Sequence, residues 1–290
     1  MQTNAGELLA DRPEIRVVLL ADGEALAATS VRLSSAAPPP PLHIHDRHAD
    51  SFLVLGGALK LDLDGTEQLV EAASWIQVPH GIAHTFSASA GPEPALFVNL
   101  HTPSTGLGAY MRGLMAATSD DDRRRAWDDF DARPAAARSG ADPAPAVVCR
   151  LGADEGEAIT DRPGRRVTLL ADTDELAVSE SVYGPGERGP DLHVHRHHTD
   201  AWIVLDGTLT FTSRDGVTCT AGAGTLVVAP PNVAHGFANE GEAAARFLNI
   251  HTPSCRFGDY LRGQNPGFDQ HDPPPDGGGD AAAILVRSLT

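Results

Sequence analysis

The sequence predicts an all-β protein of two tandem domains, each a small barrel or sandwich, with a short helical segment and a linker between them. Three observations lead to this prediction. The chain has 290 residues, a length that suits two domains of ordinary size. Its second half repeats the first at an offset of 150 positions over most of its length. Each half contains short runs rich in Val, Leu and Phe that are bounded by Gly, Pro or Asp, which is typical of β-strands.

The internal repeat defines the domains. The segment "DRPEIRVVLLAD" at Asp11 recurs as "DRPGRRVTLLAD" at Asp161, and "FVNLHTPS" at Phe97 recurs as "FLNIHTPS" at Phe247. Because the halves align almost without gaps, we interpret the chain as a tandem duplication. The predicted parts are a first domain over 1–115, a helical segment and linker over 116–146, and a second domain over 147–290.

Strands are expected along the whole of each half. In the first half they include "VRLSS" from Val31, "SFLVLGGALKLDLDG" from Ser51 and "ALFVNLH" from Ala95. Asp64-Gly65 stands between two such runs, and Asp215-Gly216 is its counterpart in the second half. Asp-Gly is a strong signal for a two-residue hairpin turn. Many short strands with frequent turns favour a barrel or a sandwich.

The segment between the halves has a different character. Ser119 is a suitable helix N-cap, and "DDDRRRAWDDF" follows it. The basic run Arg123–Arg125 could form a binding patch, but acidic residues stand four positions before and after it. We therefore predict a solvent-exposed helix whose charges pair with one another. The following "RPAAARSGADPAPA" is typical of a linker.

Two similar stretches follow the two repeats. "APAVVCRLG" from Ala144 and "AAAILVRSL" from Ala281 both have small residues, then three apolar residues and Arg. A sheet edge that is left unpaired promotes aggregation. We therefore expect Val147–Leu151 to form an edge strand in one barrel and Ile284–Leu289 to supply the equivalent strand to the opposite half.

The composition excludes several classes of function. An apolar share of 41% is enough to build hydrophobic cores, whereas a formal charge of −17 argues against nucleic-acid binding, which needs clustered Lys and Arg. The N-terminal stretch lacks the basic and apolar regions of a signal peptide, and no apolar run is long enough to span a membrane. The three cysteines form no CxxC pair, as in a reduced intracellular protein. We expect a cytoplasmic protein.

Histidines are the residues that indicate chemistry. His43 and His45 share one face of a strand, because residues i and i+2 point the same way, and the second half repeats this pair. In each half an Asp stands five positions further on, and a third His ends "PHGIAH" or "PPNVAH". Ten of the 13 histidines form five pairs matched between the halves, which argues against an accidental pattern. The residues predicted to bind metal are His43, His45, His84, His193, His195 and His235, with Asp50 and Asp200 beside them.

These residues resemble the cupin superfamily. Its first motif, HxH followed after four residues by an acid and after six more by Gly, is matched by His43, His45, Asp50 and Gly57 and by His193, His195, Asp200 and Gly207. Its second motif, PxGxxH followed by three residues and Asn, is matched by Pro79, Gly81 and His84 and by Pro231, His235 and Asn239. The resemblance covers about 100 residues of each half and implies two jelly-roll barrels.

The sequence departs from the family pattern at several positions. The acid is Asp where the family usually has Glu, and the shorter side chain affects whether Asp50 and Asp200 reach the metal. They are therefore candidates for metal ligands, for general bases, or for groups that orient a ligand. Asn239 has only Ala88 as its counterpart, and Val233 replaces the motif glycine. If one half alone is active, the retained Asn239 favours the second half.

Further residues are candidates for the surroundings of the metal. His101 and His251 share strand parity with Asn99 and Asn249, so each pair lies either inside a barrel or at a contact between barrels. The aromatic residues that share parity with ligand residues are candidate pocket walls, although core filling is favoured for the last of them: Phe86, Phe237, Trp202 and Phe52. His48 and His198, in the turn after each HxH pair, are expected at the rim or the surface.

Three imidazoles and a carboxylate leave open positions on a divalent metal and suit Fe, Mn, Ni, Zn or Cu, with one ion per domain. The resemblance, which is to the quercetin 2,3-dioxygenase-like bicupins of bacteria, implies a metal-dependent dioxygenase that oxidises a small organic enol or aromatic substrate with O₂. The alternatives are a non-redox metal-dependent isomerase or lyase, and a non-catalytic cupin that binds a small ligand beside a sealed metal site. The expected partners are a small-molecule substrate and O₂, without nucleic acid or membrane, and a homodimer is left open.

Overall fold

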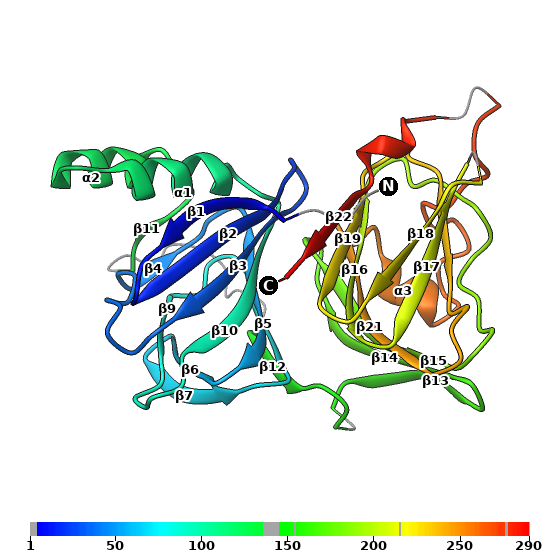
Figure 1. Ribbon diagram of the computed structural model, residues 1–290, viewed down its shortest axis with the longest axis horizontal. Coiled ribbons are helices and arrows are strands. Elements are labelled where there is room, and N and C mark those ends of the chain that lie inside the picture. The colour runs from blue at the N-terminus through cyan, green and yellow to red at the C-terminus, as the bar shows by residue number, and fades with distance from the viewer. Residues whose placement is uncertain (1–4, 136–144, 154, 215, 276–277, 290) are drawn as a thin grey trace. The chain divides into compact units, whose positions relative to one another are not determined.

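The computed structural model describes residues 5–135, 145–153, 155–214, 216–275 and 278–289. It divides into two compact units, one over Gly6–Ala153 and one that contains Asp154–Thr290. Each unit combines a seven-stranded sheet with a smaller sheet, and Figure 1 shows that strands make up most of both units. The predicted all-β fold of two tandem barrels is confirmed.

The first unit contains two antiparallel sheets. In spatial order, the strands of the larger sheet are β1 (Glu7–Asp11), β2 (Ile15–Asp22), β3 (Ala27–Leu33), β10 (Ala95–Thr102), β5 (Ala49–Gly56), β8 (Ser74–Val78) and β12 (Val147–Arg150). Those of the smaller sheet are β11 (Arg133–Pro134), β4 (His43–Ile44), β9 (His84–Ala88), β6 (Ala58–Leu63) and β7 (Thr66–Glu71). Asp64 and Gly65 connect β6 and β7 with φ angles of 52° and 82°, as the predicted hairpin turn requires.

The second unit repeats this arrangement. The larger sheet has the order β13 (Glu157–Arg162), β14 (Arg165–Asp172), β15 (Ala177–Tyr183), β21 (Ala245–Thr252), β16 (Thr199–Asp206), β19 (Thr225–Ala229) and β22 (Leu285–Ser288). The smaller sheet has the order β18 (Thr218–Gly222), β17 (Thr208–Ser213) and β20 (His235–Ala238). A single bridge between His193 and His235 takes the place of the β4–β9 pairing. Asp215, of the second predicted turn, lies outside the described residues.

Each larger sheet is completed by a strand from the segment that follows the barrel. β12 pairs with β8, and β22 pairs with β19, where it is the red strand in Figure 1. The two predicted strands therefore form, in opposite halves. The predicted second domain began at Val147, whereas the compact units divide after Ala153, because Val147 to Arg150 pair with Gln77 to Ser74 of the first unit.

Helices follow β10 in the first unit and β21 in the second. They are α1 (Leu107–Ala116), α2 (Asp120–Asp128) and α3 (Phe257–Leu261), with a short 3-10 turn at Ala281–Ala283. The helix predicted after Ser119 is α2, and Ser119 forms a capping box with Asp122. α1 and α3 were not predicted. Of the predicted linker, Arg133–Pro134 forms β11, and residues 136–144 lie outside the described part. No helix in the described ranges is long and apolar enough to cross a membrane.

A hydrophobic core of buried side chains fills part of each barrel. Phe52 and Phe97 are buried at the centre of the first barrel, and Trp202 and Phe247 occupy the equivalent positions in the second. Phe52 follows Asp50 by two positions along β5, so its ring lies on the same inner face as the carboxylate. The polar residues of the site are therefore carried on strands that the core holds in place.

The glycine that ends each first motif is required by the backbone. Gly57 and Gly207 have φ angles of 62° and 69°, which disfavour other residues. A Cβ at either position would lie 2.4 Å from a carbonyl oxygen, that of Pro94 or that of Ala244. This close approach fixes the turn after the strand that carries the motif aspartate.

Candidate metal centres

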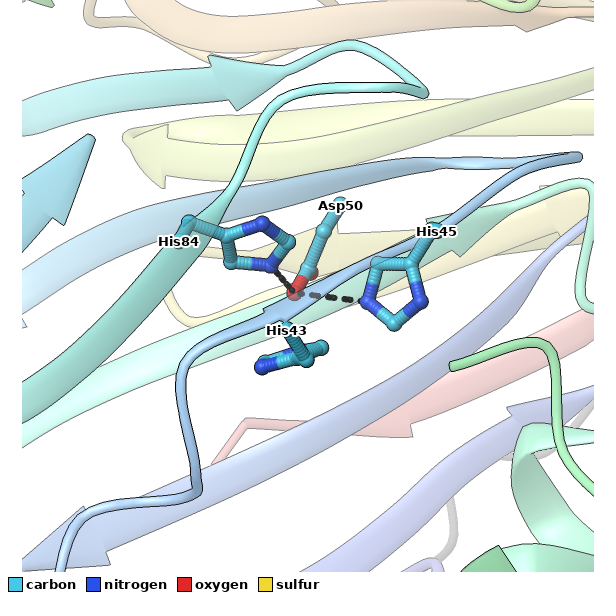
Figure 2. Close-up of side chains that lie close together, drawn as sticks. All are labelled: His43, His45, Asp50 and His84. Carbon is cyan, nitrogen blue, oxygen red and sulfur yellow. Dashed lines mark hydrogen bonds and ion pairs between the residues drawn. The ribbon is translucent and has the colours of Figure 1, made fainter. Parts of the chain in front are cut away.

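Four of the predicted side chains meet inside the first barrel. His43 and His84 lie opposite each other on β4 and β9, Asp50 comes from β5 of the facing sheet, and His45 directly follows β4. All four are buried, and one ligand atom of each lies within 4.8 Å of those of the others. Figure 2 shows the three imidazoles around the Asp50 carboxylate.

Backbone carbonyl groups fix the orientation of these imidazoles. Nδ1 of His43 and of His84 donates to the carbonyl oxygen two residues earlier, at 2.7 and 3.0 Å. Nδ1 of His45 donates to the carbonyl oxygen of Asp131 at 2.5 Å. With the proton on Nδ1, each ring presents an unprotonated Nε2 to the centre. Nε2 of His45 is buried and has no hydrogen-bond partner among the described residues, which suits a metal ligand.

The second barrel repeats this geometry. His193 and His235 donate from Nδ1 to the carbonyl oxygen two residues earlier, at 2.7 and 2.8 Å, and His195 donates to the carbonyl oxygen of Asp269. The Nε2 atoms of His193 and His195 lie 3.1 Å apart. Because both rings carry their proton on Nδ1, neither Nε2 has a proton to share. A cation between these lone pairs would remove their repulsion, and Oδ2 of Asp200 lies beside them, 3.5 Å from Nε2 of His195.

Burial favours the neutral form of His43, His45 and His193. Burial and the neighbouring His84 lower the pKa of His43 to about 4. Burial and the neighbouring His235 lower the pKa of His193 to about 3. Burial also lowers the pKa of His45 well below its usual value. Neutral imidazole is the form that binds a metal ion.

The aspartate lies within the cluster rather than at its edge. Oδ2 of Asp50 is 3.3 Å from Nε2 of His84 and 3.9 Å from Nε2 of His45. Oδ1 accepts a hydrogen bond from Nδ2 of Asn99 and lies 3.4 Å from Nε2 of His101. Burial raises the pKa of Asp50, but the imidazoles of His101 and His84 lower that pKa by more, so the carboxyl is ionised. The Asp carboxylate thus reaches the imidazoles despite its short side chain.

Of the two orientations expected for His101 and His251, the structure shows the inward one. His101 lies opposite Asp50 across β10 and β5, and antiparallel residues that lie opposite each other share a face. His251 lies opposite Asp200 in the same way. Nδ2 of Asn249 donates to Oδ1 of Asp200 at 2.5 Å. In each half an amide therefore donates to the carboxylate, and Nε2 of the imidazole donates in turn to the amide oxygen at 3.1 Å.

His48 and His198 were expected at the rim or the surface, but both are fully buried. Nδ1 of His48 donates to Oδ2 of Asp131 at 2.8 Å, and Nδ1 of His198 lies 3.0 Å from Oδ2 of Asp269. These carboxylates belong to residues far along the chain and pair with Nδ1 of each imidazole, while Nε2 of His48 is buried without a hydrogen-bond partner in the described structure. Burial is tolerated because the polar nitrogen has a charged partner.

A Phe-Asp pair after each barrel holds this region together, a role that was not predicted from the sequence. The Phe130 ring packs against His45, with centroids 5.8 Å apart, while the Asp131 carboxylate also accepts the backbone N–H of Arg47 at 2.9 Å. Phe268 and Asp269 make the corresponding contacts in the second half. The signal was present, since "FD" follows both repeats. It recurs at an offset of 138 positions rather than 150 and so falls outside the gapless alignment.

The aromatic candidates divide into two groups. Phe86 and Phe237 line the cavities beside the clusters, as expected for pocket walls. Phe52 and Trp202 are both 0% exposed and belong to the core beneath. The expectation of core filling for Phe52 is confirmed. Trp202, which was expected in a pocket wall, belongs to the core as well, because its side chain is packed among buried apolar residues and does not line the cavity.

Asn239 lies outside the cluster. Its Nδ2 donates to the carbonyl oxygens of Tyr183 and Ala243, both at 2.8 Å. It therefore holds the loop between β20 and β21 and makes no contact with the imidazoles in the described structure. Its retention gives no reason to favour the second half as the active one.

A cavity adjoins each cluster, and the two cavities differ. The first has a volume of about 560 Å³, and the second about 340 Å³. Equivalent positions carry apolar residues in the first and polar or aromatic ones in the second, namely Ile15, Val31 and Leu33 against Arg165, Ser181 and Tyr183. The two clusters are thus alike, while the walls around them have diverged.

Two jelly-roll barrels in tandem, each with three imidazoles and a carboxylate in its interior, define the bicupin architecture. A family model for the cupin domain matches residues 31–101 and 179–251. The chain belongs to the cupin family and carries two cupin domains, as the resemblance of its motifs implied.

Comparison with individual proteins gives the same fold. Quercetin 2,3-dioxygenase of Bacillus subtilis (strain 168) is 26% identical over 232 residues, which cover 68% of this chain and 65% of that protein's length. A cupin 2 conserved barrel domain protein from Leptotrichia buccalis has a TM-score of 0.55 at 10% identity and covers 84% of this chain and 91% of its own. Oxalate decarboxylase of Bacillus subtilis has a TM-score of 0.52 at 20% identity, covering 87% and 77%. The chain is thus similar in sequence to a dioxygenase and in fold to a decarboxylase.

Proposed function

We propose that the chain is an enzyme that holds one divalent transition metal in each barrel. The observation that carries this proposal is the convergence of three unprotonated Nε2 atoms and a carboxylate oxygen in a buried site. The ligands in the first barrel would be His43, His45 and His84, with Asp50 beside them. This donor set suits Fe, Mn, Ni, Zn or Cu.

We further propose that the first barrel is a dioxygenase for a flat organic enol. When bound, the metal supplies a Lewis-acid centre with open positions for substrate and O₂. The apolar cavity binds the organic body of the substrate and excludes water from it. Oδ2 of Asp50 faces the cluster and accepts the proton of the enol hydroxyl, while Nδ2 of Asn99 donates to Oδ1 and His101 in turn donates to the amide oxygen of Asn99. The substrate is the reductant and O₂ the oxidant, and both oxygen atoms end in the organic products.

The first barrel is the better candidate because its cavity suits such a substrate. A volume of about 560 Å³ lies within the range typical of small-molecule sites, and its walls are apolar and aromatic with few polar groups. The kinship with a quercetin 2,3-dioxygenase supports the reaction class. The second barrel has the same cluster beneath a smaller cavity, where Ser181 and Tyr183 replace the apolar Val31 and Leu33 of the first.

Metal analysis and O₂ uptake test this proposal together. The purified protein should contain two divalent ions per chain. Each of the single variants His45→Ala and His195→Ala should contain one. Turnover of 3-hydroxyflavone should consume one O₂ per molecule and should be lost in His45→Ala. Loss in His195→Ala alone would assign the chemistry to the second barrel. Turnover without O₂ uptake would identify an isomerase or lyase, and bound metal without turnover of any enol or catechol would identify a ligand-binding protein.

A further inference from the structure

The first half contains twelve residues that have no counterpart in the second. Tyr110 and Tyr260 are equivalent positions of the repeat, and the rings of Phe130 and Phe268 stack on them at 4.4 and 4.6 Å. Twenty positions separate Tyr110 from Phe130, whereas eight separate Tyr260 from Phe268. The additional residues extend α1 beyond the length of α3 and add α2, which lies beside α1 in Figure 1.

This insertion forms one wall of the first cavity. Met115, Arg124 and Trp127 line it, and the Trp127 ring lies edge-on to the ring of His43, with centroids 5.6 Å apart. The second cavity is lined by residues of α3, whose counterparts in α1 also line the first cavity, so the α2 residues are an addition to the first. The insertion therefore enlarges the first cavity and brings α2 into ring contact with a predicted metal-binding imidazole.

Arg124 is the cation of this wall that lacks a partner. Arg123 pairs with Asp120 at 3.0 Å, and Arg125 pairs with Asp122 at 2.5 Å. The predicted self-pairing of the helix therefore holds for two of its three arginines. The Arg124 guanidinium has no ion pair or hydrogen bond with any residue in the described ranges. Arg124 is exposed on this wall, so its guanidinium is open to a ligand that enters the cavity.

The cavity thus offers two polar regions separated by apolar walls. Asp50 is the one acidic side chain among the described cavity residues, and it lies at the cluster, away from α2 on the facing sheet. Arg124 lies on the α2 wall, where no carboxylate of the cavity competes for it. A guanidinium is weakly hydrated and binds a planar anion through paired hydrogen bonds.

We propose that α2 selects the substrate of the first barrel. The cavity binds a flat aromatic molecule whose enol oxygen faces the cluster and whose remote carboxylate or sulfonate pairs with Arg124. This inference rests on the proposed function and names the substrate class of the same site.

Calorimetric titration of the full chain loaded with Zn²⁺, which has no redox chemistry, tests the inference by binding alone. The two ligands are 3-hydroxyflavone and its 4′-carboxylate. The wild-type protein should bind the carboxylate about tenfold more tightly, the effect of one charge-assisted hydrogen bond. Arg124→Gln should abolish this preference and leave the affinity for the neutral ligand unchanged. Arg125→Gln removes the same charge from the same helix outside the cavity and should keep the preference.

The possible results separate the two proposals. A preference that persists in Arg124→Gln, or equal affinities in the wild-type protein, would overturn the role of Arg124 and leave the oxygenase function standing. Binding of the carboxylate that depends on Arg124, without O₂ uptake by the protein loaded with a redox-active metal, would overturn the oxygenase function and leave the role of Arg124 standing. Failure of both ligands to bind would overturn both.

Discussion

Replacing Asp131 with Ala should weaken metal binding in the first barrel and leave the second unchanged. The Asp131 carboxylate accepts hydrogen bonds from Nδ1 of His48 at 2.8 Å and from the backbone N–H of Arg47 at 2.9 Å, while its carbonyl oxygen accepts from Nδ1 of His45 at 2.5 Å. The variant removes the carboxylate and keeps the carbonyl. It therefore releases the segment that orients His45 without altering any predicted metal-binding side chain.

The size of the effect follows from burial. His48 is fully buried, and a hydrogen bond to a charged group contributes about 1.5–3 kcal/mol. Oγ1 of Thr105, 2.8 Å from the same nitrogen, offers a second acceptor and keeps the loss near the lower end. Arg47 is exposed, so water can replace the carboxylate there. We expect the free energy of unfolding of the first half to fall by about 2 kcal/mol. Its metal affinity should fall about 10–100-fold, as when a group that orients a ligand imidazole is removed.

Competitive titration of the metal-free protein with Zn²⁺ against a chromophoric chelator measures the two sites. Asp269→Ala is the matched variant and should weaken only the second site. Asp129→Ala removes an exposed carboxylate from the same segment and should leave both sites unchanged. Two wild-type affinities in a folded Asp131→Ala protein would refute the argument that this segment orients His45.

Three further predictions concern stability. Truncation after Ala283 should remove most of the stability of the second half in thermal unfolding, because it deletes three buried aliphatic side chains worth about 1.5–3 kcal/mol each. A truncated chain as stable as the full one would contradict the role of β22. Asn239→Ala should lower the melting temperature, because it removes the hydrogen bonds to the carbonyl oxygens of Tyr183 and Ala243, and should keep both metal ions. Loss of a metal ion in this variant would show that Asn239 contributes to the metal site. Burial raises the pKa of Asp131, but a hydrogen bond with His48 lowers it to about 2. Burial also raises the pKa of Asp269, and a hydrogen bond from the backbone N–H of Arg196 lowers it to about 2. Because these folded-state pKa values are depressed, the metal-free protein should lose stability as the pH falls from about 4 towards 2. A urea midpoint as sensitive to acid in Asp131→Asn as in the wild-type protein would exclude this contribution.

The sequence predicted the parts of the site that depend on neighbouring residues. His43 and His45 are two positions apart, so strand alternation places them on a common side, and Asp50 lies at the start of the next strand a few residues later. The helix α2 was likewise predicted from its cap, because Ser119 bonds to a residue three positions on. In both cases the interacting groups are close in the chain, and the local pattern contains the information.

The missed features depend on contacts between distant residues. His48 was expected near the surface because nothing around it shows that Asp131, 83 positions later, returns to bond with it. The position of Asp131 beside His48 depends on the pairing of β11 with β4, and no local sequence pattern predicts this pairing. The position of Val147 in the first unit depends in the same way on its register with β8. Sequence reasoning therefore located the side chains that cluster in each barrel but not the segments that hold them.

The closing strands determine where this chain can be divided. Each barrel receives its last strand from the segment directly downstream of it, so the duplicated unit includes that strand. A first half that ends at residue 146 would leave the edge of β8 open to pairing with other chains, whereas one that ends at residue 153 keeps that edge covered. We therefore expect the two halves to be obtainable as separate proteins when the cut follows Ala153. Each cluster could then be loaded with metal and assayed in the absence of the other.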